Sequence, residues 1–124
     1  MDKRTVETWV ERYLRAWSTN DPQDIGQLFA EEALYYTGPF DEPWRGQEGI
    51  VQGWLDRKDE PGTWSFRYQV LVAADSVGVV RGWAQYHNPD REYSNIWAIH
   101  FDEQGRCTEF TEWWMQRKQH AAGG

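Results

Sequence analysis

The chain contains a single cysteine, Cys107, among its 124 residues, so no disulfide can form within it. A lone cysteine fits a reducing compartment. The first residues do not form the apolar stretch of a signal peptide, and we expect a cytoplasmic protein. No segment approaches the about 20 consecutive apolar residues that a membrane-spanning helix needs, so we expect no membrane partner.

Basic residues are too few and too scattered to form a surface for nucleic acid. Thirteen lysines and arginines stand against 20 acidic residues, which gives a formal net charge of -7. No basic run is longer than Arg117–Lys118. Phosphate backbones and anionic membranes attract clustered cations, so neither is an expected partner.

The sequence also lacks the spacings that bind metals and nucleotides. Its three histidines are scattered and show no zinc or iron pattern with the cysteine and the carboxylates. There is no glycine-rich phosphate loop and no dinucleotide fingerprint. We therefore predict neither a metal nor a cofactor.

Aromatic residues, in contrast, are abundant: nine tryptophans, six tyrosines and five phenylalanines. Such rings bury large apolar areas, and they recur in cores, ligand pockets and interfaces alike. A chain of this length can bury a core without a disulfide or a metal. We predict one domain over residues 1–119 and a flexible tail over residues 120–124.

Helical periodicity dominates the first half of the chain. A continuous apolar stripe predicts a helix near residues 5–19. Asp21 suits the N-cap of a short second helix, and Pro22 suits its first position. A strand is expected near residues 33–37 and a third helix near residues 47–58, with the intervening "GPFDEPWRG" as a loop.

From about residue 63 the apolar period changes to two, which is typical of strands. We predict four strands near residues 63–73, 77–87, 92–101 and 106–117, joined by short turns. This order indicates an α+β fold, with three helices packed on one face of a curved, mainly antiparallel sheet.

The last hairpin can be placed in register if residues 102–105 form a four-residue loop. Asn95 then pairs with Glu112, and a slip of one residue would exchange the two faces. One face of this hairpin carries Tyr93, Asn95, Trp97, Ile99, Thr108, Phe110, Glu112 and Trp114. The other carries Ser94, Ile96, Ala98, His100, Cys107, Glu109, Thr111, Trp113 and Met115.

Both faces of the predicted sheet carry apolar side chains. The aromatic face of the 63–73 strand most naturally meets Val77, Val79, Arg81 and Trp83. The register of the 87–92 turn leaves open which face Arg81 and Trp83 occupy. Because so few helices can cover only one face, we predict a homodimer through the outer face.

Three segments carry a resemblance to a known family: "NDPQDIGQLFAEEA", "RGQEGI" and "FDEQGR". With the order of elements, they resemble the cone-shaped, cystatin-like proteins of the nuclear transport factor 2-like superfamily, in particular its SnoaL-like branch. That branch includes polyketide cyclases, ketosteroid isomerases and dehydratases. The resemblance covers nearly the whole chain and implies a small apolar ligand held between the helices and the sheet.

Ketosteroid isomerase uses an aspartate base and an oxyanion hole made of a tyrosine and a protonated aspartate. The resemblance places Tyr13 at the position of the catalytic tyrosine. It places Thr37 at the position of the base and Trp97 at that of the protonated aspartate. Both acids are therefore missing, and the proton-shuttling mechanism does not carry over.

Glu112 is the candidate general acid or base. Beside Asn95 and between Trp97 and Trp114, it would be desolvated, which would raise its pKa. Tyr13 or Asn95 would stabilise negative charge developing on a substrate oxygen. The alternatives are structural, with Glu112 held in a polar network and Tyr13 in the core.

Two functions follow from the sequence. The first is an enzyme of the isomerase, cyclase or dehydratase class that acts without a cofactor on an apolar cyclic metabolite. The second is a non-catalytic binding module with an aromatic cage. In either case the residues predicted to contact the ligand are Thr37, Trp54, Tyr93, Trp97, Phe110 and Trp114.

Overall fold

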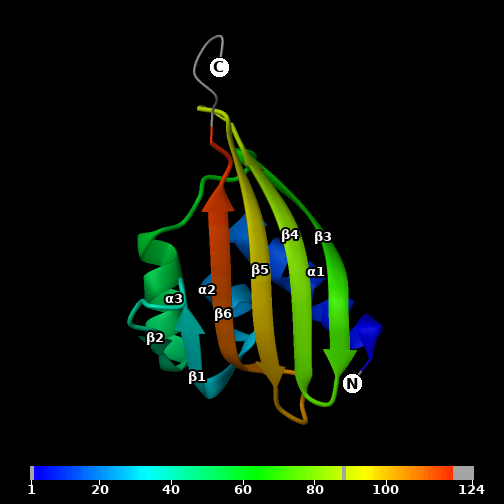
Figure 1. The fold of residues 1–124 in the computed structure, drawn as a ribbon. Helices are drawn as coiled ribbons and strands as arrows, with labels where there is room; N and C mark the ends of the chain where they lie inside the picture. The colour runs from blue at the N-terminus through cyan, green and yellow to red at the C-terminus, as the bar shows by residue number, and fades with distance from the viewer. Residues whose placement is uncertain (1, 88, 119–124) are drawn as a thin grey trace.

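The computed structural model describes residues 2–87 and 89–118, which form three helices and one six-stranded sheet (Figure 1). The strand order is β2-β1-β6-β5-β4-β3, with β1 and β6 parallel and the other neighbours antiparallel. The α+β class is confirmed, and the curved sheet is mixed. The predicted tail, residues 120–124, lies outside the described residues.

The second helix begins where its capping residue predicts, and the first begins two residues earlier than expected. Helix α1 spans Lys3–Thr19, and the carboxylate of Asp2 accepts a hydrogen bond from the Thr5 amide at 2.9 Å. It ends at Asn20, which takes the left-handed conformation. Helix α2 spans Pro22–Gly26 and is capped by Asp21. The apolar stripe of α1 is buried against the sheet.

The next segment differs in part from the prediction. Strand β1 spans Phe29–Tyr36, four residues earlier than expected, and it is irregular between Phe29 and Leu34. The segment predicted as a loop contains a two-residue strand, β2 (Trp44–Arg45), which pairs with β1. Helix α3 then spans Gly46–Asp56.

The four long strands lie within one or two residues of their predicted bounds. They form one curved surface that α1 crosses on its inner side (Figure 1). The strands are β3 (Trp64–Ala74), β4 (Val77–Tyr86), β5 (Arg91–Phe101) and β6 (Cys107–Gln116).

The predicted pairing of β3 with β4 is wrong. Phe66 stands opposite Ala84 and Tyr68 opposite Gly82, so the aromatic face meets small residues. A Cβ at Gly82 would collide with the ring of Phe66, which explains why glycine stands there. A bulge between residues 70 and 72 accounts for the shift. Arg81 and Trp83 consequently face outward.

The β5–β6 hairpin is shifted by two residues from the predicted register. Asn95 stands opposite Trp114, and Trp97 stands opposite Glu112. The predicted faces survive because a shift of two preserves the alternation of side chains. The irregularity near Cys107 turns that residue into the core, so its predicted outward position is wrong.

The core lies between the helices and the inner face of the sheet. Trp97, Phe29 and Phe110 are its largest fully buried side chains. On the outer face, Trp113 is 44% exposed and Met115 is 74% exposed. Within the described ranges, no helix is both long and apolar enough to cross a membrane.

Candidate functional site

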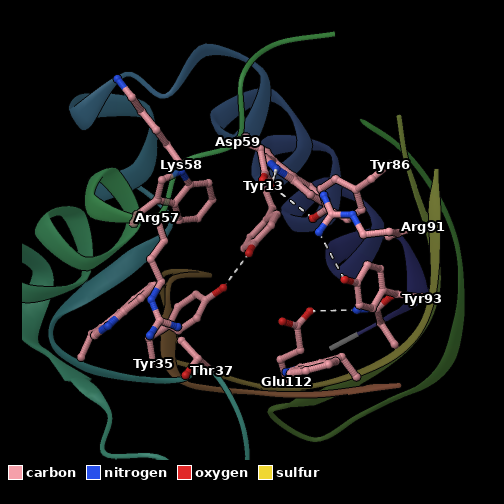
Figure 2. A pocket seen from close by; sticks show the side chains of 16 residues that line it. Tyr13, Tyr35, Thr37, Arg57, Lys58, Asp59, Tyr86, Arg91, Tyr93 and Glu112 are labelled. Atoms are coloured by element: carbon pink, nitrogen blue, oxygen red, sulfur yellow. Dashed lines mark hydrogen bonds between the residues drawn. The ribbon is translucent and has the colours of Figure 1, made fainter. Parts of the chain in front are cut away.

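A cavity of about 340 Å³ opens between α1, the end of α3 and the inner face of the sheet (Figure 2). Aromatic rings form much of its wall, and acidic and basic side chains lie among them. It is lined by Tyr13, Trp17, Tyr35, Thr37, Trp44, Trp54, Arg57, Lys58, Asp59, Ala84, Tyr86, Arg91, Tyr93, Asn95, Glu112 and Trp114.

Glu112 projects from β6 into this cavity. Its Oε2 atom accepts hydrogen bonds from Asn95 Nδ2 at 3.1 Å and from Trp97 Nε1 at 2.8 Å. Oε1 takes no hydrogen bond from the residues that the structure describes, and no lysine or arginine among them forms an ion pair with the carboxylate. Burial raises the pKa of Glu112, and the two hydrogen bonds only partly oppose that shift. The pKa of this carboxyl group is therefore closer to neutral pH than the pKa of an exposed glutamate.

Asn95 supplies one of these donors from β5 and is itself only 7% exposed. Its amide nitrogen is used by Glu112, but its Oδ1 atom has no partner among the described residues. Buried polar atoms are nearly always hydrogen-bonded. The Oδ1 atom is thus an unsatisfied acceptor, shielded from solvent, on a residue that lines the cavity.

Two tyrosines face Glu112 across the cavity. The hydroxyl oxygens of Tyr13 and Tyr35 lie 2.7 Å apart, as the dashed line in Figure 2 shows. Burial holds the pKa of both phenols well above the usual range, so both remain protonated. Each phenol has one proton. One proton forms the bond between them, and the other is free to be donated to a ligand.

The sequence model for SnoaL-like domains matches residues 10–110. The chain belongs to the SnoaL-like family. This confirms the resemblance to the nuclear transport factor 2-like superfamily that the sequence motifs indicate. No curated protein matches the sequence significantly.

Three solved structures support the same fold for this SnoaL-like chain. An NTF-2-like protein of unknown function from Burkholderia xenovorans LB400 has a TM-score of 0.74 at 10% identity, over 98% of this chain and 91% of that one. A cystatin-like protein from Silicibacter pomeroyi DSS-3 has a TM-score of 0.62 at 16% identity, over 86% and 73%. The epoxide hydrolase/cyclase-like enzyme SalBIII, described in pyran ring formation in salinomycin, has a TM-score of 0.72 at 12% identity, over 92% and 93%. At these identities the likeness concerns the fold.

Most of the residues predicted for the site lie on the wall of the SnoaL-like cavity. Tyr93 and Trp114 lie at its rim, where their ring centroids are 5.8 Å apart and Trp114 is 56% exposed. Trp54 packs on Tyr13 at 4.8 Å, and Thr37 donates to Asp41 at 2.9 Å.

Trp97 and Phe110 do not line the cavity, in contrast to the prediction. Both are fully buried beneath the lining residues. Trp97 reaches the site only through its indole N–H, which holds Glu112. Phe110 stacks on Tyr35 at 4.5 Å. Their place in the structure is to support and orient the lining residues.

Several lining residues were not predicted from the sequence. Asp59 Oδ2 accepts hydrogen bonds from Trp17 Nε1 at 2.9 Å and from the Tyr86 hydroxyl at 3.1 Å, which joins α1 to β4. Tyr35 was identifiable in principle, because it precedes Thr37 by two residues in the predicted strand 33–37, and residues two apart in a strand share a face. Asp59 follows α3 in a segment without periodicity, and nothing in the sequence places it there.

Three positively charged side chains make the cavity less apolar than the sequence predicts. Arg57, Lys58 and Arg91 all contribute to its lining. In the part of the chain that the structure describes, no group of three or more histidine, cysteine, aspartate or glutamate side chains could hold a metal ion. The candidate chemistry of the described site therefore lies with the carboxyl, amide, phenol and guanidinium groups.

Proposed function

We propose that the protein is an enzyme of the cyclase or isomerase type, in which Glu112 transfers a proton on a cyclic metabolite bound in the cavity. The observation that carries this proposal is the environment of the carboxyl group. Two neutral N–H groups hold it, none of the described lysines and arginines forms an ion pair with it, and burial raises its pKa. A general acid or base works best when its pKa lies near the operating pH.

The two oxygens of Glu112 have separate tasks in this proposal. Asn95 and Trp97 fix Oε2, so the orientation of the carboxyl group is set before a ligand arrives. Oε1 is left to take a proton from the ligand or to give one to it. Fixed donors need no reorganisation during the reaction, which is the main source of such catalysis.

In this proposal the tyrosine pair donates a hydrogen bond to an oxygen atom of the ligand. The free phenolic proton of Tyr13 and Tyr35 can be donated to a carbonyl oxygen while Glu112 removes a proton from the adjacent carbon. In its acid form, Glu112 can instead protonate the oxygen of a strained cyclic ether. A hydroxyl group of the same ligand attacks the ring carbon as its carbon–oxygen bond breaks, and that hydroxyl then loses its proton to water. The similar fold of SalBIII, which has a role in pyran ring formation, favours ring chemistry of this kind as a class.

A binding module is the second candidate. The positions that the resemblance assigns to the two family acids hold Thr37 and Trp97. The cavity wall also contains four tryptophans, Trp17, Trp44, Trp54 and Trp114, whose faces can hold an apolar ring without reacting with it.

Proton exchange distinguishes the two candidates. We would incubate the protein in D₂O with 2-tetralone, a bicyclic ketone with acidic protons beside its carbonyl group, and follow deuterium incorporation by NMR. We expect acceleration by the native protein and a loss of at least about 100-fold in Glu112→Gln. Glutamine keeps an oxygen that accepts both hydrogen bonds but cannot transfer the proton.

The matched control is Glu109→Gln. Glu109 stands on the same strand but on the outer face, where it lies 3.8 Å from His100. Exchange that survives unchanged in Glu112→Gln would remove Glu112 from the chemistry. Binding of 2-tetralone without any exchange by the native protein would favour the binding module.

A further inference from the structure

Arg91 is the first residue of β5 and faces the cavity in line with Tyr93 and Asn95. Figure 2 shows its guanidinium group beside the rings of Tyr86 and Tyr93. The guanidinium carbon lies 4.8 Å from the centroid of Tyr86, and Nη1 lies 3.5 Å from the Tyr93 hydroxyl. The Nε atom is shielded from solvent and has no hydrogen-bond partner among the described residues.

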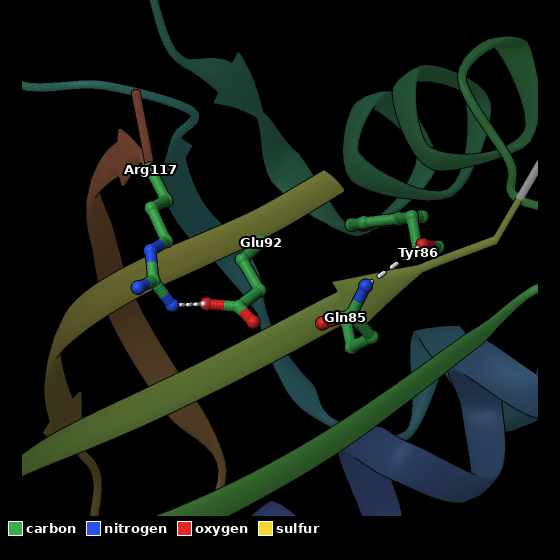
Figure 3. Close-up of polar contacts among 4 residues, drawn as sticks. All are labelled: Gln85, Tyr86, Glu92 and Arg117. Carbon is green, nitrogen blue, oxygen red and sulfur yellow. Dashed lines mark hydrogen bonds and ion pairs between the residues drawn. The ribbon is translucent and has the colours of Figure 1, made fainter. Parts of the chain in front are cut away.

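The acidic residues around Arg91 have other partners. Its neighbour Glu92 points to the outer face and pairs with Arg117 at 3.1 Å (Figure 3). Asp90 lies 3.6 Å from His87. Asp59 is bound by the Trp17 indole and the Tyr86 hydroxyl. None of the ion pairs between described residues includes Arg91.

Arg91 has no anionic partner among the described residues. The guanidinium group carries a positive charge, and the Arg91 side chain is partly buried. A partly buried cation without an anion is less stable than a paired one. The rings of Tyr86 and Tyr93 stabilise it in part through their faces. Because the shielded Nε atom is out of a ligand's reach, the terminal Nη groups of this lining residue are the donors that a ligand can contact.

The other two cations of the lining do not surround the same position. Figure 2 shows Arg57 beside Tyr35 and Thr37, on the opposite side of the cavity, and the side chain of Lys58 extends away from it. A single guanidinium group therefore faces this part of the cavity. One positive charge matches one negative charge, which favours a carboxylate over a doubly charged phosphate.

We propose that Arg91 binds a carboxylate group of the ligand, so that the ligand is a cyclic carboxylic acid instead of a wholly apolar molecule. The inference rests on the proposed function in that both use the same cavity. The planar fork of arginine matches the two oxygens of a carboxylate. The tyrosine and tryptophan rings bind the cyclic part, and the bound carboxylate determines which part of that ring faces Glu112.

Calorimetry with two matched probes tests the proposal. 2-Naphthoate and 2-naphthamide share one apolar body and differ in charge. We expect the native protein to bind 2-naphthoate at least about tenfold more tightly, since hydrogen bonds to charged groups are stronger than neutral ones. Arg91→Gln should lose this preference while its affinity for 2-naphthamide changes by less than about twofold.

The matched control is Arg81→Gln. The Arg81 guanidinium group also lies over a ring, 4.7 Å from the centroid of Trp83, but on the outer face. This variant should keep the preference for 2-naphthoate. The unfolding midpoint of each variant shows whether it is folded. Equal native affinity for the two probes would overturn the proposal, as would a parallel loss of both in Arg91→Gln or no binding of either at millimolar concentration.

The two proposals fail in different experiments on the native protein. A preference for 2-naphthoate without proton exchange on either 2-tetralone or a 2-tetralone that carries a carboxylate group removes the enzyme function and leaves the carboxylate site. Proton exchange without a preference for 2-naphthoate removes the carboxylate site and leaves the enzyme function.

Discussion

The inner face of the sheet leaves polar groups without partners, whereas the outer face pairs its charges. On the inner face, Asn95 Oδ1 and Arg91 Nε have no partner among the described residues. On the outer face, Glu92 and Arg117 form an ion pair (Figure 3), and Arg81 stacks on the ring of Trp83. Unsatisfied buried groups are unfavourable in the free protein. Asn95 and Arg91 both line the inner cavity, so these unsatisfied groups belong to its wall.

Volume alone does not distinguish the inner cavity from a second cavity on the protein. A second hollow of about 400 Å³ lies between β3, β4 and β5, and Arg67, Trp83, Glu92 and Arg117 are among its lining residues. It is larger than the 340 Å³ cavity. Its charges, however, are already engaged within the protein: Glu92 binds Arg117, and Arg67 stacks on Trp83 at 4.7 Å. Chemistry, and not volume, identifies the inner cavity as the site.

The largest expected contrast is between two tryptophans, one on each face. Trp97 is 1% exposed, and Trp97→Ala should destabilise the protein by about 3–5 kcal/mol because it opens a cavity in the core. Trp113 is 44% exposed, and Trp113→Ala should lower the free energy of unfolding of the monomer by less than about 1 kcal/mol. Urea unfolding of both variants measures the difference. Equal losses would contradict the separation of the two faces.

The outer face also tests the homodimer predicted from the sequence, which remains a proposal. The side chains of Trp113 and Met115 on β6 are 44% and 74% exposed, and Leu71 on β3 is 48% exposed, so apolar side chains of this face are uncovered. We expect Trp113→Glu to raise the dimer dissociation constant by about 30-fold, as removal of a central interface aromatic does. Sedimentation at micromolar concentration measures this constant. Phe40→Glu is the control, since Phe40 is equally aromatic and 100% exposed in a loop. A native monomer would contradict the proposal.

Sequence patterns predicted the faces of the sheet better than its register. Alternation assigns Asn95 and Glu112 to one face, and that assignment survives because the hairpin shifts by an even number of residues. Bulges have no signature as clear as alternation. The bulge near Cys107 and the one between residues 70 and 72 therefore caused the errors in pairing.

The candidate site was predictable where regular strands build it and not where turns do. Glu112, Asn95 and Tyr13 lie in periodic segments, so their inward direction follows from the pattern. Arg91 follows a turn whose register the sequence does not determine. Asp59 lies beyond the end of α3, and its hydrogen bonds to Trp17 and Tyr86 depend on the tertiary packing.

A smaller effect is expected from the pH dependence of Glu112. Burial raises its folded-state pKa above the value of about 4.3 in an unfolded chain, so the folded protein binds this proton more tightly. The resulting stability is complete below the unfolded-state pKa and is lost as the pH rises through the folded-state pKa. Glu112→Gln should therefore have a higher urea midpoint than the native protein at about pH 8, and the gap should shrink towards about pH 4.

Glu103→Gln is the control for this measurement, because Glu103 is exposed in the turn before β6. A gap for Glu112→Gln that is widest in acid would have the wrong sign and would contradict the raised pKa. A stable but inactive Glu112→Gln would show that the buried carboxyl group is retained at a cost to stability, as is common for residues that act in a site.

The smallest expected effect concerns the ion pair on the outer face. Arg117 Nη1 lies 3.1 Å from Glu92 Oε2, but their side chains are 74% and 50% exposed. Water and salt screen such pairs, so a double-mutant cycle of Arg117→Gln and Glu92→Gln should give a coupling energy below about 1 kcal/mol. Urea unfolding of the four proteins measures it, and added salt should reduce it further. A coupling well above this value would show that the outer pair is as strongly held as a buried one. The two faces would then differ in whether a charged side chain has a partner within the protein, and the strength of the pairing would not be the difference between them.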